Sequence, residues 1–160
     1  MQHILTVVIL LAMFGTPALS QNLTTLSLDD VAAIGLQIEA DSTAKCEGRA
    51  STKITTLWPT TVCLGEVEGP AIENAKLVYT ARVKTALEGS AYLEMWAHLG
   101  GGQYFSRGMN STVSGRSDWQ TIQTPFFFQM GQTPDKVTLN LVINGKGTVW
   151  IDDIVISGIE

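Results

Sequence analysis

Hydrophobic and polar residues alternate with a period of two along most of the chain after residue 33. This period is typical of β-strands whose two faces meet different environments. Turn signals separate the alternating runs, among them Glu88-Gly89 and Asn144-Gly145. The Asn-Gly pair is the one that a tight hairpin prefers, because both residues tolerate positive φ. The pattern predicts strands near residues 34–40, 50–57, 60–66, 76–85, 90–99, 102–107, 119–128, 136–144 and 147–157.

Eight or nine strands with little helix predict an all-β fold, an antiparallel β-sandwich or jelly roll. Three of the strands separate their residues into an apolar row, which we expect in the core, and a mixed row on the outside of a sheet. The predicted core rows are Leu77, Tyr79, Ala81 and Val83; Ala91, Leu93, Met95, Ala97 and Leu99; and Val137, Leu139, Leu141 and Ile143. The outer row of the 90–99 strand contains Tyr92, Glu94, Trp96 and His98.

The first twenty residues follow a different pattern. An almost unbroken apolar run, Ile4 to Phe14, ends at Gly15 and Pro17, and Ala18-Leu19-Ser20 places small residues where a signal peptidase reads them. We therefore predict a signal peptide over 1–20 and a single jelly-roll domain over 21–160, in a secreted, periplasmic or cell-surface protein. The alternative is that the same segment stays attached as an N-terminal anchor.

Export changes the interpretation of the two cysteines. Cys46 and Cys63 are the only thiols of the chain, and in an oxidising compartment two such thiols usually pair. We expect a Cys46–Cys63 disulfide, with two separate buried thiols as the alternative.

Composition excludes several classes of function. The chain has 10 Lys and Arg against 15 Asp and Glu, a net charge of −5, and no basic run, which argues against nucleic-acid binding. Residues 21–160 contain no apolar run near the roughly 18 residues of a membrane span. No Gly-x-Ser-x-Gly motif occurs, and His98 lies on a predicted strand without an evident nucleophile, so we expect no enzyme.

Motifs in the last third resemble a known fold. They are Ser117-Asp118-Trp119-Gln120, then Pro134-Asp135-Lys136-Val137, then the closing strand Gly147-Thr148-Val149-Trp150-Ile151-Asp152-Asp153-Ile154. They resemble the C-terminal half of the galactose-binding-like jelly roll of family-4, family-9 and family-22 carbohydrate-binding modules. Tyr92 to Trp96 and Tyr104 to Gly108 are also similar to a family of secreted bacterial jelly-roll proteins. The resemblance covers residues 70–157 and implies the fold, with carbohydrate binding as an expectation.

The resemblance also implies a structural calcium ion. In those modules the first Asp of the closing pair helps to hold calcium with a carboxylate from an early strand and backbone carbonyls. Asp152 is the matching residue, and Glu39 is the weaker candidate for the second carboxylate. Calcium accepts six to eight such oxygens. The alternative is that Asp152 accepts hydrogen bonds from a neighbouring loop without any ion.

Alternation places one candidate ligand site on the outer faces of three strands. Sugar rings stack their C–H faces on Trp and Tyr, while carboxylates, amides and Arg bind the hydroxyls. The residues that fit this chemistry are Arg82, Tyr92, Glu94, Trp96 and Asn140. In the alternative, the two aromatic rings pack under a loop and Arg82 forms a cross-strand ion pair with Glu94.

The sequence therefore predicts an exported, non-catalytic module that binds a carbohydrate or glycan-like ligand. A structural or adhesive cell-surface β-sandwich with protein partners is the first alternative. A small glycan-cleaving enzyme is the second, and it would need two carboxyl groups facing one another in a cleft. Exposure of Trp96 favours the binding module, whereas burial under a loop favours the structural protein.

Overall fold

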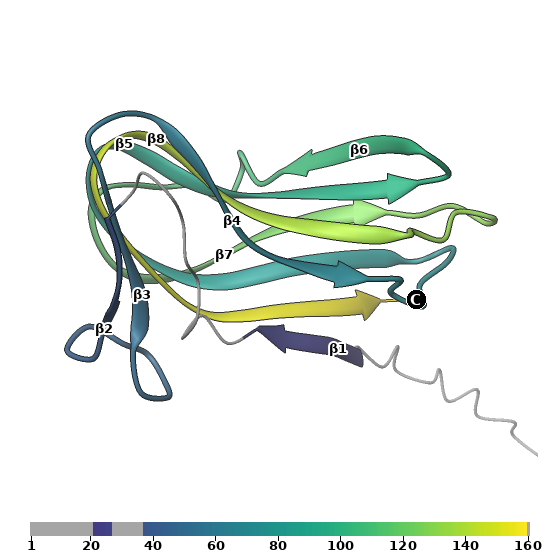
Figure 1. Ribbon diagram of the computed structural model, residues 1–160, viewed down its shortest axis with the longest axis horizontal. Coiled ribbons are helices and arrows are strands. Elements are labelled where there is room, and N and C mark those ends of the chain that lie inside the picture. The colour runs from purple at the N-terminus through teal and green to yellow at the C-terminus, as the bar shows by residue number, and fades with distance from the viewer. Residues whose placement is uncertain (1–20, 27–36, 160) are drawn as a thin grey trace, which may run out of the picture.

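The computed structural model describes residues 21–26 and 37–159, and this part of the chain contains strands, turns and loops but no helix. All strand pairings are antiparallel, so the predicted all-β class is confirmed. The predicted signal peptide lies outside the described residues. The strands are β1 (Gln21–Leu26), β2 (Gln37–Asp41), β3 (Ser51–Thr56), β4 (Thr60–Glu68), β5 (Lys76–Leu99), β6 (Gly102–Arg107), β7 (Val113–Phe127) and β8 (Lys136–Ile159) (Figure 1).

Two very long strands organise the fold. β5 and β8 have 24 residues each and pair along almost their whole length, from Lys76 opposite Ile159 to His98 opposite Lys136. The predicted turns at Glu88-Gly89 and Asn144-Gly145 are therefore wrong. Both positions lie inside a continuous strand, where Gly89 pairs with Gly145.

The paired glycines allow the β5–β8 ribbon to bend. Gly89 has a φ of 140° and Gly145 a φ of 154°. A Cβ on Gly89 would collide with the carbonyl oxygen of Asn144, and one on Gly145 with that of Glu88. Only glycine permits so close an approach of two backbones. Figure 1 shows the ribbon curving at one end of the molecule, where the labels β5 and β8 lie.

The bend distributes the two long strands over two layers. In one layer, the first half of β5 pairs with β7, and the last part of β8 pairs with β1. In the other layer, the second half of β5 pairs with β6, and the first half of β8 pairs with β4. β3 joins β8 close to the bend and carries β2 on its outer edge. The result is a β-sandwich whose layers share their two central strands.

The core lies between the layers. The predicted rows beginning at Leu77, Ala91 and Val137 are fully buried, except for the partly buried Leu99 at the end of its row. They belong to one cluster that also includes Ile54 of β3 and Ile122 of β7. Period-two alternation thus assigned the inner side chains correctly in both layers. The residues between them along each strand point to the outer surfaces.

Candidate functional site

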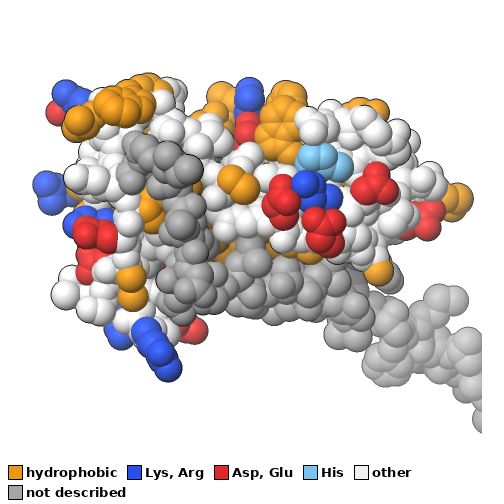
Figure 2. Space-filling view, viewed as in Figure 1, with side chains coloured by type: hydrophobic (Ala, Val, Ile, Leu, Met, Phe, Trp, Pro, Cys, Tyr) orange, Lys and Arg blue, Asp and Glu red, His pale blue; other side chains and the backbone are white. Residues whose placement is uncertain are grey.

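The outer surface of the β4–β8–β5–β6 layer brings candidate side chains together in rows. Glu94 of β5 stands opposite Asn140 of β8 on one side and opposite Arg107 of β6 on the other. In the next row, Trp96 stands opposite Phe105. Figure 2 shows apolar, basic, acidic and histidine side chains gathered over this part of the molecule.

Glu94 is the centre of this arrangement. Although its side chain has outer parity, only 5% of the residue is exposed. Its Oε1 accepts hydrogen bonds from the indole Nε1 of Trp96 at 2.7 Å and from the amide of Asn140 at 3.4 Å, and its Oε2 accepts one from Nε of Arg107 at 2.6 Å. Burial acts to raise the pKa of Glu94, but the hydrogen bonds from Arg107 and Trp96 outweigh it and lower the pKa. The carboxylate is therefore ionised at neutral pH.

Aromatic rings extend the surface onto the edge strand β6. The Trp96 and Phe105 rings have centroids 5.3 Å apart and are tilted by 44°. The guanidinium carbon of Arg107 lies 4.6 Å from the centroid of the Phe105 ring, within the range of a cation–π contact. Phe105 remains 52% exposed. We call Glu94, Trp96, Phe105, Arg107 and Asn140 the Glu94 surface.

A polar network borders the Glu94 surface. The ring Nε2 of His98 lies 3.2 Å from the hydroxyl of Thr138, which donates a hydrogen bond to Glu66 of β4 at 3.2 Å. Lys136 forms an ion pair with the same carboxylate at 3.0 Å, and the hydrogen bond from Lys136 lowers the pKa of Glu66. Donors and acceptors of this kind bind hydroxyl groups.

Three of the five predicted ligand residues, Glu94, Trp96 and Asn140, thus meet at one point. Tyr92 lies one row further along, opposite Val142, and makes no hydrogen bond to Glu94. Arg82 does not belong to the site, because it pairs with Asp152 beyond the bend, in the other layer. The alternative Arg82–Glu94 ion pair is wrong for the same reason.

Sequence reasoning missed Phe105 and Arg107. A signal for them existed, because alternation over 102–107 places Gln103, Phe105 and Arg107 on one face. The glycines at 100–102 also mark a hairpin between this strand and 90–99, and the register of that hairpin, which aligns Arg107 with Glu94, is what the sequence reasoning did not follow.

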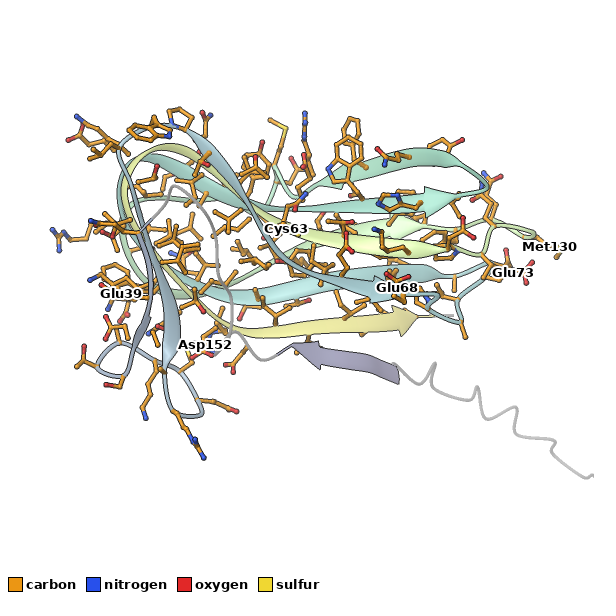
Figure 3. All side chains as sticks on the ribbon, in the orientation of Figure 1. Glu39, Cys63, Glu68, Glu73, Met130 and Asp152 are labelled. Carbon is orange, nitrogen blue, oxygen red and sulfur yellow. The ribbon has the colours of Figure 1, made fainter. Side chains whose placement is uncertain are left out.

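The candidate calcium ligands are both engaged with other groups of the protein. Oδ2 of Asp152 accepts hydrogen bonds from the backbone N–H groups of Cys46 at 2.8 Å and Glu47 at 3.3 Å, and Glu39 forms an ion pair with Lys53 at 2.6 Å. Figure 3 shows Glu39 and Asp152 near the β2–β3 end of the molecule. Within residues 21–26 and 37–159, no three His, Cys, Asp or Glu side chains form a group suited to a metal ion. Calcium binding at Asp152 and Glu39 stays a prediction.

The predicted disulfide is absent, and both cysteines are free thiols. Cys46 lies in the β2–β3 loop, bound to Asp152, whereas Cys63 lies on β4 opposite Asn140 (Figure 3). These two anchor positions on β8 lie on opposite sides of the bend and so belong to different layers. The alternative of two buried thiols is also wrong, since Cys63 is exposed and Cys46 is only partly buried.

Comparison with known proteins identifies the fold. No family model matches the chain, and no curated protein does. Among solved structures, the CBM22-1 xylan-binding domain from Paenibacillus barcinonensis Xyn10C matches with a TM-score of 0.62 and 15% identity, over 91% of this chain and 99% of that domain. A family 30 carbohydrate-binding module matches with a TM-score of 0.57 and 15% identity, over 86% of this chain and 98% of that module. The predicted resemblance to family-22 modules is confirmed at the level of fold.

Proposed function

We propose that this chain is an exported, non-catalytic carbohydrate-binding module whose ligand lies on the Glu94 surface. The observation that carries the proposal is the buried Glu94 carboxylate, which holds the Trp96 indole and the Arg107 guanidinium beside the exposed ring of Phe105. The fold, shared with modules from families 22 and 30, supports the same conclusion. The signal-peptide pattern of residues 1–20 supports export. No helix in the described ranges is long and apolar enough to span a membrane.

The geometry suits a saccharide because its parts are held in place before a ligand arrives. The Phe105 and Trp96 rings offer apolar faces to sugar C–H groups, and Arg107 retains N–H groups that Glu94 does not use. Since the hydrogen bonds of Glu94 already order Trp96 and Arg107, binding loses less side-chain entropy than it would with free rotamers. The Thr138 and His98 groups nearby add donors and acceptors for hydroxyls.

The state of Glu94 supports binding rather than hydrolysis. A glycosidase acid needs a raised pKa, and a nucleophile needs an accessible oxygen. Glu94 has a lowered pKa, and each of its oxygens accepts a strong hydrogen bond. Both properties suit a carboxylate that orients its neighbours.

The test is isothermal titration calorimetry of residues 21–160 with xylohexaose, cellohexaose and mannohexaose. We expect at least one of these to bind, and we expect Trp96→Ala to weaken that binding by roughly 5- to 150-fold, the range of a dominant aromatic anchor. Because Trp96 also contacts Glu94, a second variant, Phe105→Ala, removes an exposed ring without touching the carboxylate. Phe127→Ala removes a matched ring, 69% exposed on β7, and should leave the affinity unchanged.

Two results would contradict the proposal. The first is that none of the three saccharides binds at millimolar concentration, which would favour the adhesive alternative with protein partners. The second is that Phe105→Ala and a folded Trp96→Ala both bind as tightly as the unmodified chain.

A further inference from the structure

The other layer contains a second candidate ligand site, near the bend. Two adjoining hollows of about 380 Å³ and 240 Å³ lie on its outer surface, and both are lined by Ala86 of β5 and Arg116 of β7. The larger extends towards Leu57 and Lys146, and the smaller contains Lys84 and Trp150. The larger hollow alone falls within the size range of small-molecule sites. We call the two hollows together the Trp150 pocket.

Trp150 supplies the Trp150 pocket with a fixed aromatic wall. It lies on β8 between Lys84 of β5 and Lys53 of β3, on the outer parity of the layer. Its indole Nε1 donates a hydrogen bond to Asp41 of β2 at 2.9 Å. The Asp41 carboxylate is held in turn by Thr43, and the hydrogen bonds from Thr43 and Trp150 keep the pKa of Asp41 far below its usual range. The hydrogen bond to the ionised Asp41 carboxylate thus fixes the orientation of the Trp150 ring.

The charges around the Trp150 pocket leave one cation unmatched. Lys84 forms an ion pair with Asp118 at 3.3 Å, and Lys146 forms one with Glu88 at 2.9 Å. Arg116 has no ion pair or hydrogen bond to any side chain in the described part of the protein, although it borders both hollows. In a chain of net charge −5, this is a local positive centre.

We propose that the Trp150 pocket binds a saccharide that bears a carboxylate, a uronic acid unit. The sugar ring packs against Trp150, and the guanidinium of Arg116 binds the carboxylate through the two parallel N–H donors that match its geometry. Paired Lys84 and Asp118 are placed to bind ring hydroxyls. The site shares its ligand class with the proposed function but uses none of the residues of the Glu94 surface, so the two are tested separately.

The experiment uses trigalacturonate and its fully methyl-esterified form, which has the same sugars without the charge. Binding to residues 21–160 is followed by NMR titration and calorimetry at low and moderate salt. We expect the acid to bind at least 10-fold more tightly than the ester, with shifts at Ala86, Arg116 and Trp150. We expect Arg116→Ala to weaken binding of the acid at least 5-fold.

Two variants serve as controls. Arg49→Ala removes the same charge from an exposed arginine in the β2–β3 loop, and it should change the affinity for the acid less than 2-fold. Phe105→Ala alters the Glu94 surface and should leave the affinity for the acid unchanged, since Phe105 lies in the other layer.

Three outcomes would overturn the proposal. They are equal binding of acid and ester, an equal loss in Arg49→Ala and Arg116→Ala, and no binding of the acid at millimolar concentration. If Phe105→Ala abolishes binding of the acid while Arg116→Ala does not, the acidic sugar binds the Glu94 surface. In that case the second site is refuted and the proposed function stands.

Discussion

Replacing Glu94 by Gln tests whether a buried carboxylate organises the Glu94 surface. The variant keeps the shape of the side chain, and its carbonyl oxygen still accepts one hydrogen bond. The amide nitrogen then faces a donor, so one of the two short bonds, from Arg107 at 2.6 Å or Trp96 at 2.7 Å, is lost. Hydrogen bonds to a charged group contribute about 1.5–3 kcal/mol each. The Arg107 side chain is 44% exposed, so solvent screens the contact, and we take the lower end of that range.

We therefore expect Glu94→Gln to lower the free energy of unfolding by about 1.5 kcal/mol at pH 7. This corresponds to a melting temperature lower by roughly 3–6 °C for a domain of this size. Urea denaturation followed by tryptophan fluorescence measures the free energy, and differential scanning calorimetry measures the melting temperature. The matched control is Glu88→Gln, because Glu88 forms an ion pair with Lys146 but is 78% exposed, and it should cost less than about 0.5 kcal/mol.

The pH dependence adds a second check. Because the pKa of Glu94 is lower in the folded than in the unfolded protein, the unfolded state binds more protons between the two values, and stability rises with pH there. The contribution of Glu94 is complete above its unfolded pKa of about 4.3 and is lost as the pH falls through the folded value. The difference in the free energy of unfolding between the unmodified chain and Glu94→Gln should therefore shrink below about pH 4. A difference that stays constant from pH 7 to pH 3, or one below about 0.5 kcal/mol at pH 7, would refute the reasoning.

Two further variants test other parts of the fold. Asp152→Asn should lower the melting temperature even in EGTA, because the carboxylate accepts hydrogen bonds from the backbone N–H groups of Cys46 and Glu47 without an ion. If calcium instead raises the melting temperature of the unmodified chain and this variant abolishes the rise, the calcium site is established. Gly145→Ala should cost about 2–4 kcal/mol in urea denaturation, because its Cβ would meet the carbonyl oxygen of Glu88 at a positive φ, and a cost near zero would show that the bend tolerates a side chain.

The core was predictable from sequence because burial on one face of a strand imposes a period of two. Leu93 and Leu139 are fully buried as the alternation requires, and the same parity continues through the bend. The bend itself was not predictable. An Asn-Gly pair between two apolar runs is compatible with a hairpin and with a strand that approaches another backbone closely, and only the partner, Gly89, distinguishes the two.

The same ambiguity explains the partial prediction of the site. Arg82 and Glu94 were assigned to one surface because each has outer parity in its own predicted strand, 76–85 or 90–99. The two predicted strands are one, and its bend carries the two residues to opposite layers. Trp96 and Asn140 lie on the same side of the bend as Glu94, and their placement followed from parity alone. Arg107 was within reach of the same reasoning, because Gly100-Gly101 closes a tight hairpin between β5 and β6, and the register of that hairpin places Arg107 opposite Glu94.

The shared central strands determine how cooperatively the protein unfolds. Neither layer can open alone, because separating β5 from β8 in one layer removes the ladder that continues into the other. Slow hydrogen exchange along both strands should therefore report a single global event. The strands that pair on one side only, which are β1, β2, β4, β6 and β7, exchange through local fraying. Folding meets the same constraint in reverse. Residues 76–99 must find residues 136–159 across a long intervening segment, and the entropy of closing that loop is lost before either layer gains its flanking strands.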